Sequence, residues 1–139
     1  MITVQGYHHV RLTVTDIARS RKFYEEVFAF PVAYDLPADA DDATKAALSF
    51  LFGGVIYHVG GGLFGLRPAA PIADRFDENR VGLDHFSFGV AGKAEIDAAA
   101  ARLDSIGVAH GGVKDIGGAF ILEFRDPDNI SLELFAPGS

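Results

Sequence analysis

The sequence contains no cysteine among its 139 residues, and this absence removes several kinds of chemistry at once. Disulfide bonds, thiolate nucleophiles and cysteine-ligated zinc or iron–sulfur centres all need the missing side chain. Histidine, aspartate and glutamate are then the strong side-chain ligands left for a metal ion. Any metal site in this chain must therefore be built from imidazole and carboxylate groups.

Positive charge is also scarce, since 12 Lys and Arg residues stand against 19 Asp and Glu residues and the formal net charge is −7. Nucleic acids and anionic membranes attract proteins with concentrated Lys and Arg, so neither is an expected partner. No apolar run is long enough to span a bilayer. Residues 1–6 lack the basic start and apolar run of a secretory signal. We therefore expect a cytoplasmic protein.

What the sequence does contain is an internal repeat. A chain of this length, with 49% hydrophobic residues, suits a single domain over residues 1–139. An offset of 76 residues places His85 on His9 and superposes two strands that share one alternating apolar face. The apolar positions are Val10, Leu12 and Val14 in the first strand and Phe86, Phe88 and Val90 in the second. The sequence thus predicts two similar modules.

Each module begins with a strand that is followed by a helix. Asp16 is a suitable N-cap for the first helix, and apolar residues recur at helical spacing in both modules. In the second module, strands over residues 108–114 and 119–125 follow the helix, and a turn at residues 126–129 leads to a last strand over 130–135. Residues 81–136 therefore read as βαβββ. Paired modules of this kind predict an α+β fold with a mixed sheet and helices on its outer face.

Two hairpins compete for the end of the first module, residues 5–67. Either residues 48–52 pair with residues 55–59 through Gly53-Gly54, or residues 55–59 pair with residues 63–67 through three glycines. The second alternative leaves residues 41–48 as an inserted helix, which their composition favours, and residues 68–80 as a linker of ordinary length. We prefer it. The first alternative would place His58 near the repeat position of Glu133.

Strand alternation assigns a direction to three residues that can bind a metal. Because the apolar residues of these strands need the core, His9, His85 and Glu133 point to the opposite face of the sheet. Two imidazoles and one carboxylate from three strands are the donor set of a facial triad, which leaves coordination positions open for substrate. We expect these residues to bind a divalent ion, and iron, zinc, nickel and manganese all accept such a donor set.

Other residues near this face are candidates for substrate binding or catalysis. Arg11 is either an anion-binding residue or the partner of a glutamate on a neighbouring strand. Glu123 is either a base or a solvated strand residue. His58 completes the metal site, lines the pocket or is a polar residue of an edge strand, and Phe120 is one of several aromatic residues available to a substrate. His8 falls on the apolar side of its strand, so we interpret it as structural.

Three segments resemble the vicinal oxygen chelate superfamily, which includes glyoxalases, bleomycin-resistance proteins and extradiol dioxygenases. They are residues 8–16 with Phe23-Tyr24, residues 82–86, and residues 124–134 around the Asp-Pro-Asp-Asn turn. The resemblance covers nearly the whole chain. It implies paired βαβββ modules in a cupped, glyoxalase-like sheet around a metal that binds two adjacent substrate oxygens, and it implies a homodimer. The same resemblance implies that His9, His85 and Glu133 are the metal ligands.

Individual branches of the superfamily differ from this chain at specific positions. Glyoxalase I enzymes add a glutamate from the last strand of the first module, where this chain has Gly65 or His58. Fosfomycin-modifying members have a threonine two residues after the first ligand histidine, where this chain has Arg11. Ring-cleaving dioxygenases are generally longer and draw all three ligands from one module. The resemblance therefore implies the fold and the ligand set more specifically than the reaction.

The leading hypothesis is a metal-dependent enzyme that acts on a small metabolite with vicinal oxygens, as a lyase, an isomerase or a dioxygenase. In it, Glu133 anchors the ion and the ion polarises the substrate oxygens. The alternative is a metal-free protein, similar to the bleomycin-resistance proteins, that binds a drug or metabolite through aromatic residues such as Phe50 and Phe120.

Overall fold

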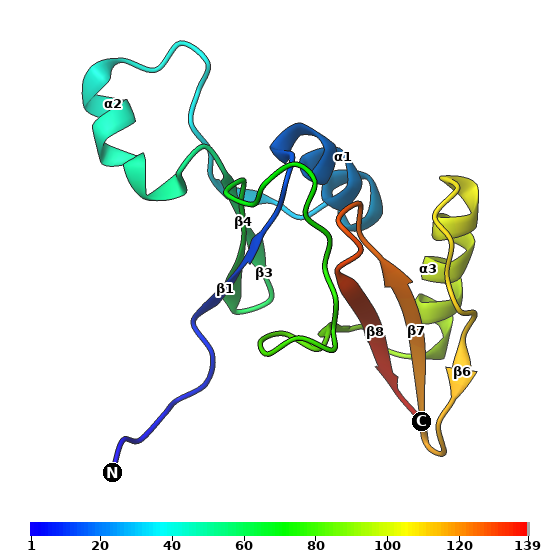
Figure 1. The fold of residues 1–139 in the computed structure, drawn as a ribbon. Coiled ribbons are helices and arrows are strands. Elements are labelled where there is room, and N and C mark those ends of the chain that lie inside the picture. The colour runs from blue at the N-terminus through cyan, green and yellow to red at the C-terminus, as the bar shows by residue number, and fades with distance from the viewer. Residues whose placement is uncertain (139) are drawn as a thin grey trace. The chain divides into compact units, whose positions relative to one another are not determined.

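The fold consists of two compact units, which we describe for residues 1–138 of a computed structural model. The first unit is Met1–Asp74, and the second begins at Arg75. Each contains one four-stranded mixed sheet, with strand orders β1-β4-β3-β2 and β5-β8-β7-β6. Figure 1 labels β1, β3 and β4 of the first sheet and β6, β7 and β8 of the second. The two orders are the same once the strands are counted within each unit. The predicted α+β class and the duplicated βαβββ pattern are thereby confirmed.

The first unit forms its sheet from strands on both sides of an inserted helical segment. Its elements are β1 (His9–Thr13), α1 (Ile17–Phe28), β2 (Val32–Tyr34), α2 (Asp42–Ala47), the 3-10 helix η1 (Ser49–Leu51), β3 (Val55–Val59) and β4 (Gly62–Arg67). β1 pairs in parallel with β4, and β3 pairs antiparallel with both β4 and β2. The β3–β4 hairpin is the second of the two alternatives, and α2 lies within the segment expected to be helical.

Helix α1 covers one face of the first sheet. Asp16 caps it by accepting a 3.0 Å hydrogen bond from the backbone N–H of Arg19, as the sequence predicts. Tyr24 of the helix is fully buried, and its ring centroid lies 5.3 Å from that of Phe64 on β4. Since side chains alternate along a strand, the neighbours of Phe64 on β4 point to the face that α1 does not cover.

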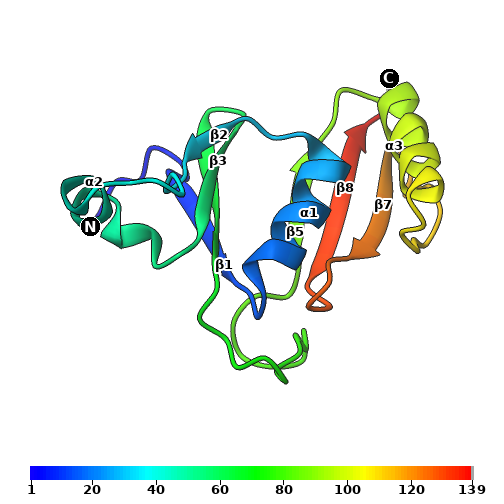
Figure 2. The ribbon, with the colours of Figure 1, turned by 90° about the horizontal axis from the view of Figure 1, so that it is seen from above.

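The second unit repeats this plan with shorter connections. Its elements are β5 (Phe86–Gly89), α3 (Lys93–Ser105), β6 (Lys114–Asp115), β7 (Ala119–Arg125) and β8 (Ser131–Pro137). β5 pairs in parallel with β8, and β7 pairs antiparallel with β8 and β6. Figure 2 shows α3 alongside the β7–β8 hairpin of its own unit, where its buried residues Ile96 and Leu103 contribute to the core.

The prediction of a strand over residues 108–114 is wrong in its extent. Only Lys114–Asp115 forms a strand, and upstream of it His110 makes a single bridge to Phe124. Gly112 has a φ of 77°, which is outside the extended region and interrupts the ladder. The apolar alternation alone did not reveal this break.

The β7–β8 turn fixes the register of the hairpin. The carboxylate of Asp126 is buried and accepts hydrogen bonds from the backbone N–H groups of Asp128 (2.9 Å) and Ile130 (2.8 Å). Asn129 takes a left-handed conformation with a φ of 69°, which Asn tolerates better than most residues. The turn places Glu123 directly opposite Glu133.

Among residues 1–138, no helix combines the length and the apolar character needed to cross a membrane.

Candidate functional site

The exposed face of the second sheet carries a row of polar side chains across three strands. Ser87 of β5 is in register with Glu133 of β8, which is in turn in register with Glu123 of β7. The flanking residues Leu132 and Leu134 are buried on the other face, so alternation turns this row away from the core. The structure therefore brings Glu133 and Glu123 together as alternation predicted.

The two glutamates of this row have different partners. The Ser87 hydroxyl donates a 2.7 Å hydrogen bond to Oε1 of Glu133, which leaves Oε2 available to another group. Glu123 forms a 2.6 Å ion pair with Nζ of Lys114, and both side chains are about half exposed. Of the two glutamates, Glu123 is therefore paired with a lysine, whereas Glu133 is hydrogen-bonded to a neutral hydroxyl group.

His85 lies immediately before β5, beside this row. Its Nδ1 is 2.5 Å from Oδ1 of Asp84, an arrangement that leaves Nε2 available. The hydrogen bond with Asp84 is the main cause that raises the pKa of His85, and the charges of Glu133, Asp84 and Glu123 act in the same direction against partial burial. Both glutamates therefore lie within electrostatic reach of the imidazole.

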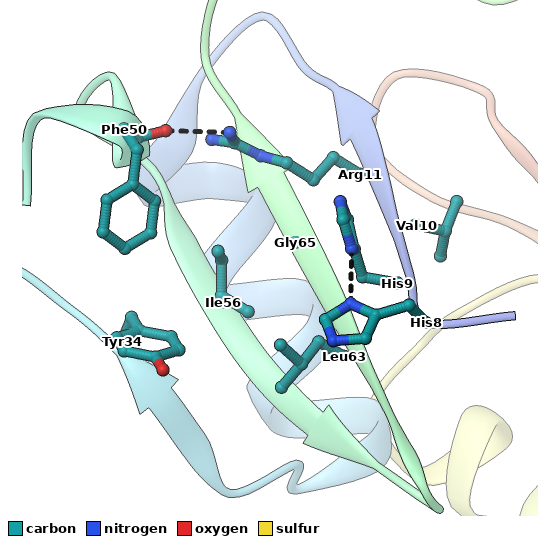
Figure 3. Close-up of a pocket in the computed structure, with 9 residues that line it drawn as sticks. All are labelled: His8, His9, Val10, Arg11, Tyr34, Phe50, Ile56, Leu63 and Gly65. Atoms are coloured by element: carbon teal, nitrogen blue, oxygen red, sulfur yellow. Dashed lines mark hydrogen bonds between the residues drawn. The ribbon is translucent and has the colours of Figure 1, made fainter.

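The first unit contains a pocket of about 360 Å³ on the face opposite α1 (Figure 3). Its lining residues are His8, His9, Val10, Arg11, Tyr34, Phe50, Ile56, Leu63 and Gly65. The Nδ1 atoms of His8 and His9 lie 2.8 Å apart. His8 is exposed and borders the pocket, so its assignment to the apolar side of the strand is wrong, because the chain is not yet in the strand at that residue.

Register assigns the first-unit counterpart of Glu133. Arg11 is in register with Gly65 on the parallel pair β1–β4, and Ser87 is in register with Glu133 on the equivalent pair β5–β8. Arg11 and Ser87 are separated by the same 76 residues that separate His9 from His85. Of the two residues considered for a fourth ligand position, Gly65 therefore occupies it, and it has no side chain to offer.

The side chain of Arg11 crosses the sheet above Gly65, as Figure 3 shows. Its Nη1 and Nη2 atoms donate to the main-chain oxygens of Phe50 (2.8 Å) and Leu51 (3.0 Å). Its Nε atom is buried and has no hydrogen-bond partner among the described residues. Arg11 therefore anchors η1 to β1, and the ion pair considered for it with a glutamate does not form in residues 1–138.

Two further predicted site residues lie elsewhere. His58 is exposed on β3, in register with Leu63, and does not line the pocket. Phe120 is in register with the buried Ala136, and Nζ of Lys93 in α3 lies 5.4 Å from its ring centroid. Phe120 is therefore on the helix side of the second sheet rather than beside Glu133.

No three His, Asp or Glu side chains in residues 1–138 form a group that could hold a metal ion. The predicted ligands are divided between the units, with His9 in the first and His85 and Glu133 in the second. The donor chemistry nevertheless fits a divalent ion. Each of the three side chains has one polar atom engaged by a neighbour and a second one available, as is usual for metal ligands.

The fold is that of a known superfamily, and the chain belongs to it. Residues 6–134 match the Glyoxalase/Bleomycin resistance protein/Dioxygenase superfamily. The resemblance inferred from the sequence is therefore confirmed.

Solved structures support the same assignment. The chain is similar to a glyoxylase/bleomycin resistance protein/dioxygenase domain from Frankia sp. EAN1pec, with 29% identity and a TM-score of 0.76 over 97% of this chain and 99% of that one. Lactoylglutathione lyase from Agrobacterium tumefaciens shares the fold at 22% identity and a TM-score of 0.68, over 96% and 94% of the two chains. A variant of the fosfomycin resistance protein FosX from Listeria monocytogenes, complexed with Mn(II) and 1S,2S-dihydroxypropylphosphonic acid, shares it at 18% identity and a TM-score of 0.71, over 99% and 95%.

Sequence reasoning missed the partners that orient the predicted ligands. Asp84 directly precedes His85, so the Asp-His pair was a usable signal for a carboxylate–histidine contact. Ser87 lies on the same alternating face as His85, but its bond to Glu133 depends on the β5–β8 register. That register joins residues far apart in the chain and is not contained in a local pattern.

Proposed function

We propose that this chain is a metal-dependent enzyme that acts on a small metabolite with vicinal oxygens, and that His9, His85 and Glu133 hold the ion. The supporting observation is the paired arrangement in the second unit. Asp84 engages Nδ1 of His85 and Ser87 engages Oε1 of Glu133, so each predicted ligand presents its other polar atom. A metal ligand held in this way keeps a fixed tautomer or orientation.

Each residue of the proposed site would have a separate role. A divalent ion bound there would act as a Lewis acid on two adjacent substrate oxygens. Asp84 accepts the Nδ1 proton of His85 and holds the imidazole in the tautomer whose Nε2 is a ligand. Ser87 orients the carboxylate of Glu133. The reaction would be of the lyase, isomerase or dioxygenase type.

Glu123 would act as a base only after release from Lys114. Its carboxylate is 2.6 Å from Nζ of that residue, so the ion pair already engages the oxygen that would approach a substrate proton. Its position opposite Glu133 supports a role beside the substrate.

One solved structure with the same fold supports the substrate class. The FosX structure from Listeria monocytogenes contains Mn(II) together with a dihydroxypropylphosphonic acid, whose two hydroxyl groups are vicinal. A divalent metal and adjacent oxygens are therefore the chemistry that we carry to this chain as a proposal.

Metal analysis with matched variants tests this proposal. We expect the protein purified without chelator to contain a transition metal, and we expect His9→Ala, His85→Ala and Glu133→Ala each to lose most of it. His110→Ala and Glu123→Gln are the controls, because each changes a residue of the same type outside the proposed ligand set. Absence of bound metal from the unmodified protein, or equal loss in the variants and their controls, would contradict the proposal.

A metal-free binding protein is the second candidate, and the pocket of the first unit favours it. The wall of this 360 Å³ pocket includes Tyr34, Phe50 and Ile56, which suit an apolar ligand. If a ligand found by screening still binds to a His9→Ala, His85→Ala double variant with unchanged affinity, sequestration rather than metal catalysis is the function.

The homodimer and the cytoplasmic location remain predictions from the sequence. Light scattering coupled to size-exclusion chromatography would test the dimer, and cell fractionation would test the location.

A further inference from the structure

Two arginines converge on one exposed aromatic ring, two residues after Phe50 of the pocket wall. Phe52 follows η1 with a left-handed φ of 51°, and 61% of the residue is exposed. The guanidinium carbon of Arg67 lies 4.6 Å from its ring centroid, and that of Arg11 lies 5.9 Å away. Both arginines come from the sheet face that α1 leaves uncovered, since Arg11 pairs with Gly65 and Arg67 is two residues further along β4.

The positive charges of these arginines are not neutralised within the described chain. Arg11 donates to two main-chain carbonyls, which are neutral acceptors. Arg67 forms no ion pair with any carboxylate in residues 1–138. Two unneutralised cations placed together repel each other, and an anion between them would remove that repulsion.

Two arginines without a carboxylate partner are unexpected in a chain with this net charge. The formal net charge is −7, so carboxylates were abundant as partners. Arg11 instead lines a pocket whose wall is aromatic and aliphatic, with Tyr34, Phe50 and Ile56, and Arg67 shares the ring of Phe52 with it. A cationic rim next to an apolar wall fits a ligand with a charged end and an apolar body.

We propose that Arg67, together with Arg11, binds an oxyanion group of the substrate at the rim of the first-unit pocket. The guanidinium fork suits carboxylate and phosphoryl oxygens alike, and both guanidinium groups lie within reach of a cation–π contact with the same Phe52 ring. The substrate class is then an anionic small metabolite. The inference rests on the proposed function only in taking the bound anion to be part of the substrate.

Titration of simple anions into the 139-residue chain tests the arginine pair. Inorganic phosphate and acetate would be added separately at constant ionic strength, after chelator treatment, and followed by NMR. We expect saturable binding that Arg67→Gln weakens about ten-fold, since charge-assisted hydrogen bonds are lost. Arg67→Lys should weaken it less. Tighter binding of phosphate would identify a phosphoryl group, and comparable binding of acetate a carboxylate.

The matched control is Arg80→Gln, which removes the same charge from an exposed arginine of the second unit. It should leave anion binding within about two-fold of the unmodified protein. Equal weakening by the two variants, or no saturable binding of either anion, would overturn the inference. Chelator-treated protein contains no metal, and Arg67→Gln should keep the metal content of untreated protein unchanged. Failure here is therefore distinguishable from failure of the proposed metal site.

Discussion

Gly65 has no side chain, and this allows Arg11 to cross the first sheet at the position where the second sheet carries Glu133. A Cβ atom at position 65 would lie 2.8 Å from Cγ of Arg11 and 3.2 Å from Cγ1 of Ile56. Both contacts are closer than carbon atoms normally approach. The single absent methyl group therefore permits the hydrogen bonds from Arg11 to Phe50 and Leu51.

Gly65→Ala should displace Arg11 and destabilise the first unit. We expect a loss of about 1–3 kcal/mol in the free energy of unfolding, typical of overpacking at a filled position. Urea denaturation measures this loss, and faster hydrogen exchange over residues 42–51 would report the release of η1. Gly61→Ala is the control, because a Cβ atom there would meet nothing within 4 Å.

A double variant shows whether Arg11 is the cause. In an Arg11→Ala background, Gly65→Ala should cost less than half as much, since the obstructing side chain has gone. An unchanged cost would mean that Ile56 or the strand conformation, rather than Arg11, excludes the methyl group.

At the scale of elements, the sequence predicted what local patterns determine. Alternation predicted the two opening strands, and Asp16 predicted the start of α1. The composition of residues 41–48 predicted the region of α2. β6 was predicted too long because φ at Gly112 is set by the turn that it serves. The partners of Glu133 and Arg11 were missed because strand register and loop packing determine them.

The β7–β8 turn depends on one buried carboxylate. Asp126→Ala leaves the N–H groups of Asp128 and Ile130 without their acceptor, and buried donors without partners are costly. We expect a loss of about 2–4 kcal/mol in the free energy of unfolding, measured by urea denaturation. Asp126→Asn keeps one accepting oxygen and should cost less than half of this. Equal costs for the two variants would show that the negative charge, rather than acceptance of the hydrogen bonds, stabilises the turn.

At the scale of the whole molecule, the segment after Asp74 belongs to the second unit because specific contacts hold it there. The backbone N–H of Phe76 donates to the oxygen of Asp128 (2.9 Å), and the amide of Asn129 donates to the oxygen of Phe76 (3.1 Å). Arg125 binds Glu78 through two hydrogen bonds, of 2.9 and 2.6 Å. Residues 75–80 lie within the linker expected from the sequence, whose composition alone does not indicate these contacts.

The Glu78–Arg125 pair gives the stability of the protein a specific dependence on acid. Hydrogen bonds from Arg125 lower the pKa of Glu78 from 4.5 to about 2 in the folded chain. A carboxylate with a lowered folded pKa stabilises the fold above its unfolded pKa, and this contribution is lost as the pH falls through the folded value. The stability difference between the unmodified protein and Glu78→Gln should therefore be constant above about pH 5 and shrink progressively toward pH 2. Urea midpoints measured for both proteins across this range test the expectation. A difference that stays the same from pH 5 to pH 3 would show that the charge of Glu78 does not stabilise the docked segment, and that the backbone contacts of Phe76 hold it alone.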